Sequence, residues 1–225
     1  MWLRLATAAL GAALMVSSAQ AEVIEHLPTK DMRVALTFDA CEGRGKPAYF
    51  DQAILDYLAA EKLPFTVFAT GLFANRNRVE LAELAKSPLV EVENHSFDHP
   101  QHMERLPQDR VRAQIADTDA VIAGITGRQP LFFRFPAGNY DADTLATVEA
   151  SGHKVVHWSF ASGDPTPGLA PAHLKNWVLS KTRPGDILIF HVNGRAPATA
   201  KALPDIVSEL RRRGVQFVRL DEVLK

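Results

Sequence analysis

Apolar runs and amphipathic segments alternate along most of this chain. Runs with strand-like composition occur at residues 33–38, 65–69, 89–92, 131–135, 154–158, 187–190 and 216–218. Segments with apolar residues at helical spacing fall between them, at residues 47–63, up to residue 84, and at 107–125, 141–150, 171–180 and 198–213. Seven strands alternating with helices predict an α/β fold, with a parallel sheet and right-handed crossover connections.

The first 21 residues have a different character. One arginine near the start precedes an apolar stretch at residues 5–16, and small residues then lead to Ala21. This pattern is typical of a secretory signal peptide cleaved after Ala21. The apolar stretch is shorter than the roughly 18 residues that span a bilayer. We therefore expect a secreted or periplasmic protein without stable membrane insertion after signal removal, with an uncleaved signal anchor as the alternative.

Residues 22–225 form a segment long enough for one sizeable core and short for two, so we expect a single domain. A formal net charge of -1 gives no electrostatic reason to expect nucleic acid or an acidic membrane surface as a partner. The chain has one cysteine, Cys41, which excludes an internal disulfide.

Five short polar strings follow or overlap the ends of the apolar runs. They are TFDACEG (37–43), HSFDHP (95–100), RFPAG (134–138), SGDPTPG (162–168) and ILIFH (187–191). Because parallel strands end at one rim of a sheet, we expect their polar side chains to lie together. That rim would hold Asp39, His95, His99, Arg134 and His191, which are the groups that metal-assisted hydrolysis requires.

His95 and His99 are four residues apart, which places both imidazoles on one side of a helical turn or tight loop. Zinc is the expected metal for such a pair in an exported hydrolase. An isolated HxxxH is more often a surface loop with solvated histidines. Because the other four strings occur in the same chain, His95 and His99 are more readily interpreted as metal ligands.

In order and content the five strings resemble the polysaccharide deacetylase family, the NodB-homology domain of carbohydrate esterase family four. The resemblance covers residues 33–224, and NHSFDHP and GDILIFH are its most specific parts. It implies an irregular (β/α)7-type barrel with its site at the C-terminal ends of the strands. It also implies a divalent-metal hydrolase that removes N-acetyl groups from a glycan such as peptidoglycan, an exopolysaccharide or a chitin-like oligosaccharide.

The resemblance assigns a role to several residues. Asp39 matches the general base, and Arg134 matches the arginine that keeps this carboxylate ionised and oriented. His191 matches the general acid, whose ordinary pKa lies near neutrality. Ala137 stands where its backbone N–H would help to hold the oxyanion. The plain alternative for Asp39 and Arg134 is a structural ion pair.

Two strings depart from the family pattern. The family usually reads TFDDG, with the second aspartate as a metal ligand, whereas this chain has Ala40 after Asp39. We expect Glu42, which directly precedes Gly43, to replace the missing ligand. The Cys41 thiolate is the competing donor. An exposed Glu42 or a buried structural Cys41, without a role at the metal, is an equal alternative. A site of two histidines and water, or no metal at all, is the last alternative.

The fourth string lacks the aspartate that usually supports the acid histidine, because Ala161 stands in its place. Support for His191 is therefore lost or taken over by Asp164. Trp158, Phe160 and Tyr140 are candidates for an apolar platform on which a sugar ring stacks, although aromatic residues near strand ends are more often core.

These residues predict an exported hydrolase of carbon–nitrogen bonds other than peptide bonds. A catalytically inactive relative that binds glycan is the first alternative. A hydrolase of the same fold that acts on non-sugar amides is the second.

Overall fold

A computed structural model describes residues 22–224, so the predicted signal peptide lies outside the described part of the chain. All of its strands belong to one sheet in which every ladder is parallel. The strands are β1 (Val23–Ile24), β2 (Arg33–Ala40), β3 (Phe65–Ala69), β4 (Val90–Asn94), β5 (Phe132–Phe133), β6 (Lys154–Val156), β7 (Ile187–His191) and β8 (Gln216–Val218). Their spatial order is β1-β6-β5-β4-β3-β2-β7, and β8 also pairs with β2.

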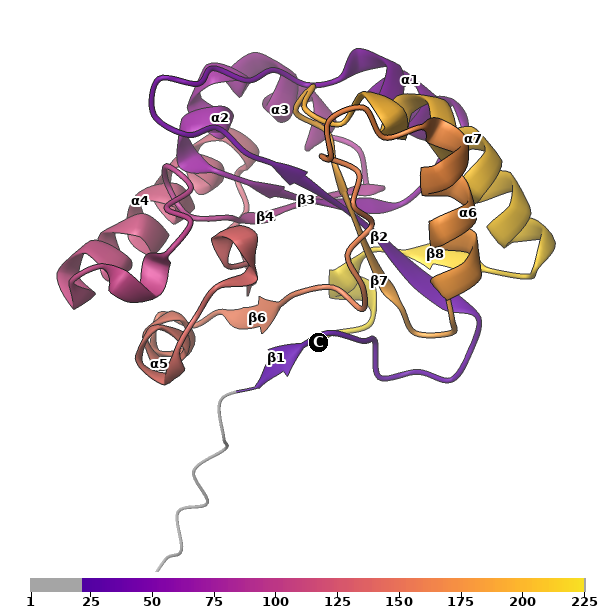
Figure 1. Ribbon diagram of the computed structural model, residues 1–225. Helices are drawn as coiled ribbons and strands as arrows, with labels where there is room; N and C mark the ends of the chain where they lie inside the picture. The colour runs from indigo at the N-terminus through magenta and orange to yellow at the C-terminus, as the bar shows by residue number, and fades with distance from the viewer. Residues whose placement is uncertain (1–21, 225) are drawn as a thin grey trace, which may run out of the picture.

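Helices surround the sheet on its outer side (Figure 1). They are α1 (Gln52–Ala60), α2 (Gly71–Arg76), α3 (Arg78–Leu84), α4 (Gln108–Thr126), α5 (Ala142–Ala150), α6 (Pro171–Lys181) and α7 (Pro197–Arg212), with short 3-10 turns η1 (Met103–Arg105), η2 (Pro136–Gly138) and η3 (Leu220–Glu222). Between residues 22 and 224, no helix combines the length and the apolar character needed to cross a membrane.

The central strand β2 shows how alternation builds two cores. Its residues Val34, Leu36, Phe38 and Ala40 face the large apolar cluster under the helices. Ala35, on the opposite face, joins a smaller cluster inside the curled sheet. Successive strand residues point to opposite faces, so one strand serves both layers.

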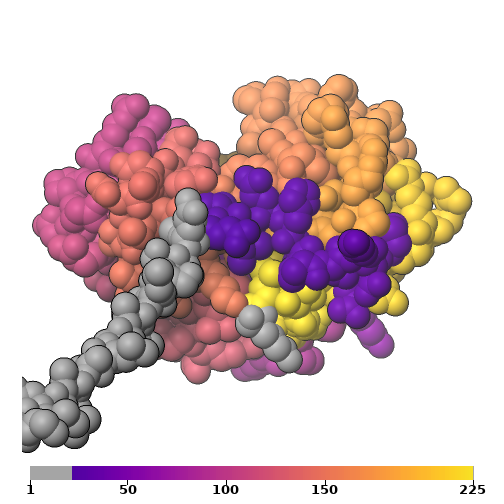
Figure 2. Space-filling model, turned by 90° about the horizontal axis from the view of Figure 1, so that it is seen from below, coloured from indigo at the N-terminus to yellow at the C-terminus, as the bar shows by residue number. Residues whose placement is uncertain are grey.

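The two ends of the sheet path approach each other, which gives an irregular barrel. Isolated bridges join His26 to Asp186 and Phe160 to Leu188, and these residues lie next to or within β1, β6 and β7. The underside is closed by the first and last described segments, which lie side by side in Figure 2. There Leu27, near β1, and Leu220 of η3 belong to the interior cluster.

The predicted α/β fold and all seven predicted strands are confirmed, with three differences. Strand β1 was not predicted, because two residues carry no recognisable alternation. The run at 131–135 shortens to β5, because η2 begins at Pro136, which has no backbone N–H to donate. The helix expected to reach residue 84 is two helices. Its break falls at Asn77, whose side-chain amide donates to the backbone oxygens of Phe73 and Ala48.

Candidate active site

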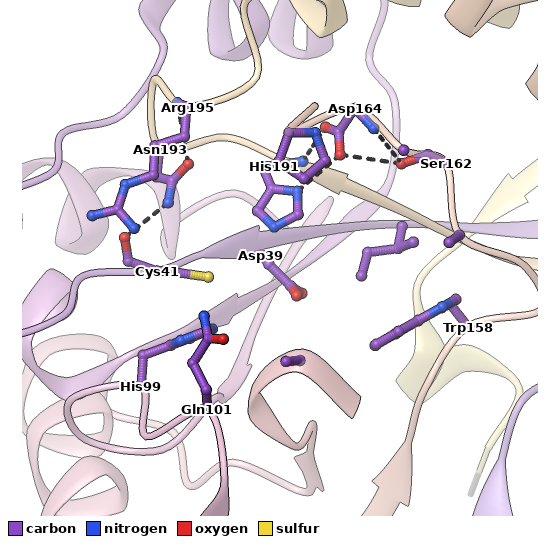
Figure 3. A pocket seen from close by; sticks show the side chains of 15 residues that line it. Asp39, Cys41, His99, Gln101, Trp158, Ser162, Asp164, His191, Asn193 and Arg195 are labelled. Atoms are coloured by element: carbon purple, nitrogen blue, oxygen red, sulfur yellow. Dashed lines mark hydrogen bonds and ion pairs between the residues drawn. The ribbon is translucent and has the colours of Figure 1, made fainter. Parts of the chain in front are cut away.

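A pocket of about 370 Å³ opens at the C-terminal ends of β2 and β7. Figure 3 shows Asp39, Cys41 and His191 pointing into it from these two strands, with His99 and Trp158 on the other sides. The ladder between β2 and β7 pairs Asp39 directly with His191. The predicted position of both residues at one rim is therefore confirmed.

Asp39 is buried and ion-paired. Its Oδ1 accepts a hydrogen bond from Nη1 of Arg134 at 2.7 Å. Burial raises the pKa of the Asp39 carboxyl, but the positive charges of Arg134 and His191 and the hydrogen bond from Arg134 outweigh it and hold the pKa below its usual range. Asp39 is thus a carboxylate at neutral pH, with Oδ2 left to face the site.

Arg134 is fixed on every side. Its Nη2 donates to Thr37 Oγ1 at 3.0 Å and to the carbonyl of His157 at 2.9 Å, and its Nε donates to the carbonyl of Val156 at 3.2 Å. The guanidinium also lies over the ring of Phe68, at 3.9 Å from its centroid. A side chain held in this way can orient a carboxylate, and lysine has no equivalent set of donors.

His95 presents a bare ring nitrogen to the site. Its Nδ1 lies 2.8 Å from the carbonyl oxygen of Arg134. A carbonyl only accepts, so Nδ1 carries the proton and Nε2 carries a lone pair. Burial lowers the pKa of His95, which keeps the ring neutral. Nε2 is buried without a hydrogen-bond partner and lies 3.4 Å from Oδ2 of Asp39, so two lone pairs face each other across that gap.

His99 completes a cluster of donors with His95 and Cys41. One ligand atom from each of these residues lies within 4.8 Å of the other two. The loop that carries the histidines turns sharply, because Ser96 and His99 both have positive φ, at 68° and 57°. The two imidazole centroids are 5.0 Å apart. The prediction that both histidines share one side of a tight loop is thereby confirmed in geometry.

These donors fit a divalent metal. Two imidazoles, a cysteine sulfur and an adjacent carboxylate are ligand types that zinc and cobalt accept. A cation would also resolve the unpartnered Nε2 of His95, whose other nitrogen is held by a backbone carbonyl as metal-binding histidines usually are.

Glu42 does not join this cluster, and the prediction that it replaces the missing ligand is corrected. Its carboxylate receives two hydrogen bonds from Arg76 of α2, at 2.6 and 2.7 Å, and one from the backbone N–H of Ala48. The extended backbone continues past β2, so Cys41 points to the same side as Asp39 and Glu42 points to the opposite side. Cys41 takes the position that the sequence prediction gave to Glu42.

His191 lies 2.9 Å through its Nδ1 from Oδ1 of Asp164. The other Asp164 oxygen accepts the backbone N–H of His191 at 2.7 Å and the hydroxyl of Thr199 at 2.8 Å. Burial lowers the pKa of His191, but the bonds with Asp164 and Cys41 outweigh it and raise the pKa well above its usual range. Of the two alternatives for the fourth string, the structure favours Asp164 as the support.

Residues predicted to contact substrate divide into two groups. Ala137 and Trp158 line the pocket. Tyr140 does not; it is stacked on Phe135, with ring centroids 5.4 Å apart. Phe160 packs against the large core. The predicted aromatic platform is therefore reduced to Trp158.

Sequence reasoning missed three residues that position the site. Thr199 and Ser162 hold Asp164, and Asn193 donates from Nδ2 to the carbonyl of Cys41 at 2.8 Å. Ser162 is the first residue of the fourth string and Asn193 lies two residues after the fifth, which was an available signal. Thr199 sits inside α7, where nothing in the local pattern marks it.

The family model described as polysaccharide deacetylase matches residues 26–156. The chain belongs to this family. A peptidoglycan-N-acetylglucosamine deacetylase from Bacillus cereus is 28% identical over 200 residues, covering 88% of this chain and 70% of that protein. A chitooligosaccharide deacetylase from Sinorhizobium fredii is 30% identical, covering 70% of this chain and 71% of that protein. These relatives belong to the enzyme class that the sequence predicted, hydrolases of carbon–nitrogen bonds other than peptide bonds.

Solved structures of the polysaccharide deacetylase family share the fold. A family 4 acetyl xylan esterase from Clostridium thermocellum, in complex with a cobalt ion, has a TM-score of 0.75 at 28% identity and covers 84% of this chain and 89% of its own. A family 4 pseudoenzyme from Bacillus anthracis has a TM-score of 0.80 at 21% identity, covering 95% and 73%. The second likeness concerns the fold alone. The predicted (β/α)7-type barrel is confirmed.

Proposed function

We propose that this protein is an exported, metal-dependent deacetylase that removes N-acetyl groups from a glycan, such as peptidoglycan, an exopolysaccharide or a chitin-like oligosaccharide. The observation that carries the proposal is the pairing of Asp39 and His191 across one pocket. Asp39 is held as a carboxylate and His191 as an imidazolium. An ionised base and a protonated acid, poised on adjacent strands, are what amide hydrolysis at neutral pH requires.

Each residue has one task in this reaction. Asp39 takes a proton from the attacking water at Oδ2, since Oδ1 is bonded to Arg134. Water adds to the acetyl carbon, the carbon–nitrogen bond breaks, and His191 gives its proton from Nε2 to the departing nitrogen. Asp164 keeps that proton on the correct nitrogen, because it fixes Nδ1–H. The products are acetate and a free amino sugar.

His95 and His99 are proposed to hold the divalent metal, with zinc as the expected ion. A bound metal of this kind supplies a polarised acyl oxygen and an acidified water. Support comes from the buried, unpartnered Nε2 of His95 and from the relative that contains cobalt. The backbone N–H of Ala137 is proposed to assist at the acyl oxygen.

Trp158 is the proposed contact for the sugar ring. It lines the pocket and is stacked on His157, with ring centroids 5.2 Å apart, so its orientation is fixed before substrate binds. An ordered aromatic face suits the apolar face of a pyranose. We propose no role for nucleic acid. Residues 22–225 would act as one catalytic domain after removal of the signal peptide.

A catalytically inactive, glycan-binding relative is the second candidate, because Ala40 and Ala161 replace two carboxylates of the family pattern. The same fold also occurs in a pseudoenzyme. Against this candidate, Asp164 supports His191 and Cys41 stands among the metal donors. Within the described residues, Cys41 can therefore replace the metal ligand lost at Ala40, and Asp164 can replace the supporting carboxylate lost at Ala161.

The experiment is a measurement of acetate released by the purified mature protein from peptidoglycan, chitin oligosaccharides and an acetylated exopolysaccharide. Small cyclic amides serve as the comparison substrates. Acetate from at least one glycan, abolished by a chelator and restored by zinc, is the expected result. Glycan binding without acetate release would identify the inactive relative, and turnover confined to the cyclic amides would identify the non-sugar hydrolase.

A further inference from the structure

We infer that the Cys41 thiolate is the third protein ligand of the metal, so that the centre is a cysteine–histidine–histidine site. The carboxylate expected from the family resemblance is absent at Ala40, and the structure assigns its place to sulfur. The inference deepens the proposed function and rests on the presence of its metal site.

The fold places Cys41 among the donors and Ala40 away from them. Ala40 is fully buried in the large apolar cluster under the helices. Cys41 follows with the opposite orientation, so it shares a side with Asp39 two residues before it. Figure 3 shows the sulfur directed into the pocket between His99 and His191. One ligand atom each from Cys41, His95 and His99 lies within 4.8 Å of the others.

A second observation points to a cation in this cluster. Nε2 of His95 is buried, with the residue only 1% exposed, and has no hydrogen-bond partner. It lies 3.4 Å from Oδ2 of Asp39, and a ligand atom of the same ring lies within 4.8 Å of the Cys41 sulfur. A buried acceptor without a partner is unfavourable, and a metal ion bound here would supply the partner.

The backbone around Cys41 is fixed before any metal binds. Asn193 donates to the carbonyl of Cys41 at 2.8 Å. The next residue, Glu42, donates its backbone N–H to Thr70 Oγ1 at 2.9 Å. These contacts on both sides hold the sulfur in one orientation, as the partners of a metal ligand should.

Sulfur in the first coordination sphere changes which ion the site selects. A thiolate carries the same single negative charge as the carboxylate it replaces, but it is a soft ligand. Soft ligands favour zinc, and cobalt as its spectroscopic substitute, over magnesium, calcium and manganese. Three protein ligands also leave a fourth position of a tetrahedral centre open to water or substrate.

Cys41 has a competing role that the experiment must separate. Its sulfur is also within 4.8 Å of a ligand atom of His191 and of Asp39, so Cys41, His191 and Asp164 resemble the arrangement of a cysteine nucleophile. A nucleophilic cysteine stays free of metal and becomes acylated during turnover. A metal ligand does neither.

The wild-type protein suits a spectroscopic test because Cys41 is its only cysteine. We expect metal-free protein loaded with cobalt(II) to show a sulfur-to-cobalt charge-transfer band in the near ultraviolet. The zinc-loaded protein should show a zinc–sulfur distance of about 2.3 Å by X-ray absorption. Stoichiometric metal binding without either signal would overturn the inference, as would failure of the protein to bind either ion. Both measurements use the wild type and need no variant.

Variants then connect the signal to affinity. Cys41→Ser should lose the cobalt band and bind zinc more than about 100-fold more weakly, since loss of an outer-sphere partner alone costs 10–100-fold. Cys41→Asp should lose the band but recover zinc binding, because it restores a charged ligand. Glu42→Gln is the matched control and should keep both the band and the affinity. Unchanged zinc affinity in Cys41→Ser would contradict the assignment.

Failure of the inference and failure of the proposed function give different results. Acetate release that requires metal, without a sulfur signal, would overturn the ligand assignment and leave the deacetylase proposal standing. A sulfur signal without acetate release would support the ligand assignment and overturn the deacetylase proposal. An acyl group found on Cys41 by mass spectrometry during turnover would show that Cys41 is a nucleophile and would overturn its assignment as a metal ligand.

Discussion

Strands β2 and β4 bury carboxyl groups in opposite ways. In β2, Asp39 is paired with Arg134 and its pKa is lowered. In β4, Glu91 and Glu93 lie side by side on one face of the strand. Burial raises the pKa of Glu91 to about 7 and that of Glu93 well above its usual range.

The neighbours of the carboxyl groups explain the difference. Glu91 accepts from the Thr66 hydroxyl and the backbone N–H of Leu220, and Glu93 accepts from the N–H groups of Leu131 and Phe132. These dipoles satisfy the oxygens, but they do not offset burial and the repulsion between two acids. Arg134 supplies a full charge to Asp39. The comparison shows that a buried cation keeps the pKa of Asp39 low, whereas hydrogen-bond donors alone leave the pKa values of Glu91 and Glu93 raised.

The largest predicted effect is at the rim. Asp39→Asn should reduce kcat for acetate release by about 10²–10⁴-fold, the usual contribution of a general base. Asp51→Asn is the matched control. Asp51 caps α1 through bonds to the N–H groups of Ala53 and Ile54, and asparagine caps a helix about as well as aspartate, so this variant should keep both its fold and its activity. Circular dichroism confirms folding at the assay temperature. Near wild-type kcat in folded Asp39→Asn would remove it as the base.

The activity of His191 as the proposed acid should depend on its carboxylate partner, Asp164. Asp164→Asn should lower kcat at least about 10-fold by analogy with the loss of other orienting carboxylates, because His191 loses the acceptor that fixes its tautomer. In a His191→Gln background the same change should have little further effect. The measurement is a double-mutant cycle on kcat, and independent, additive losses would contradict the pairing.

Trp158 and Tyr140 were both candidates for the sugar platform, but only Trp158 lines the pocket, so their substitution should affect KM differently. Trp158→Ala should raise KM by roughly 2- to 10-fold, equivalent to the 0.5–1.5 kcal/mol of an aromatic contact. Tyr140→Ala is the matched control and should leave KM within about 2-fold, since Tyr140 does not line the pocket. Equal effects of both changes would contradict the assignment of the platform to Trp158.

Glu91→Gln, in β4, has the smallest predicted effect on activity. This variant should leave kcat unchanged and alter the stability of the fold instead. The folded-state pKa of Glu91 is raised, so the folded protein binds more protons than the unfolded chain between about pH 4.5 and 7. Its stabilising contribution is present below pH 4.5 and is lost as the pH rises through 7.

Glu91→Gln has no proton to lose in that range. Its melting temperature relative to the wild type should therefore rise between pH 5 and pH 7.5, by on the order of a few degrees. Differential scanning calorimetry at both pH values gives this difference directly. A melting-temperature difference that stays constant with pH would show that Glu91 is already ionised in the folded protein.

Much of this account could be predicted from the sequence, because its signals are local. Apolar runs gave seven strands, and the rule that parallel strands end at one rim brought Asp39, His95, His99, Arg134 and His191 together. Each of these residues lies at a strand end or in the loop that follows. Side-chain direction is fixed by alternation there, so the prediction needed little tertiary information.

The predictions that failed concern side chains whose positions depend on contacts between residues far apart in the sequence. Glu42 was the predicted ligand because it directly precedes Gly43, but its carboxylate is bonded to Arg76 of α2. The local sequence contains no pattern that predicts this ion pair. Alternation from Asp39 would have favoured Cys41. Tyr140 was a candidate for the sugar platform because it is an aromatic residue near a strand end, yet it is stacked on Phe135 and does not line the pocket. Thr199 reaches Asp164 from α7, which only the folded chain reveals.

The most direct test of the central claim is a zinc titration of the metal-free protein, with bound zinc and acetate release from an N-acetylated oligosaccharide measured on the same samples. The account predicts that both rise together and saturate at about one zinc per chain. Full acetate release before zinc binds, or a zinc-saturated protein that releases no acetate from any N-acetylated glycan, would contradict it.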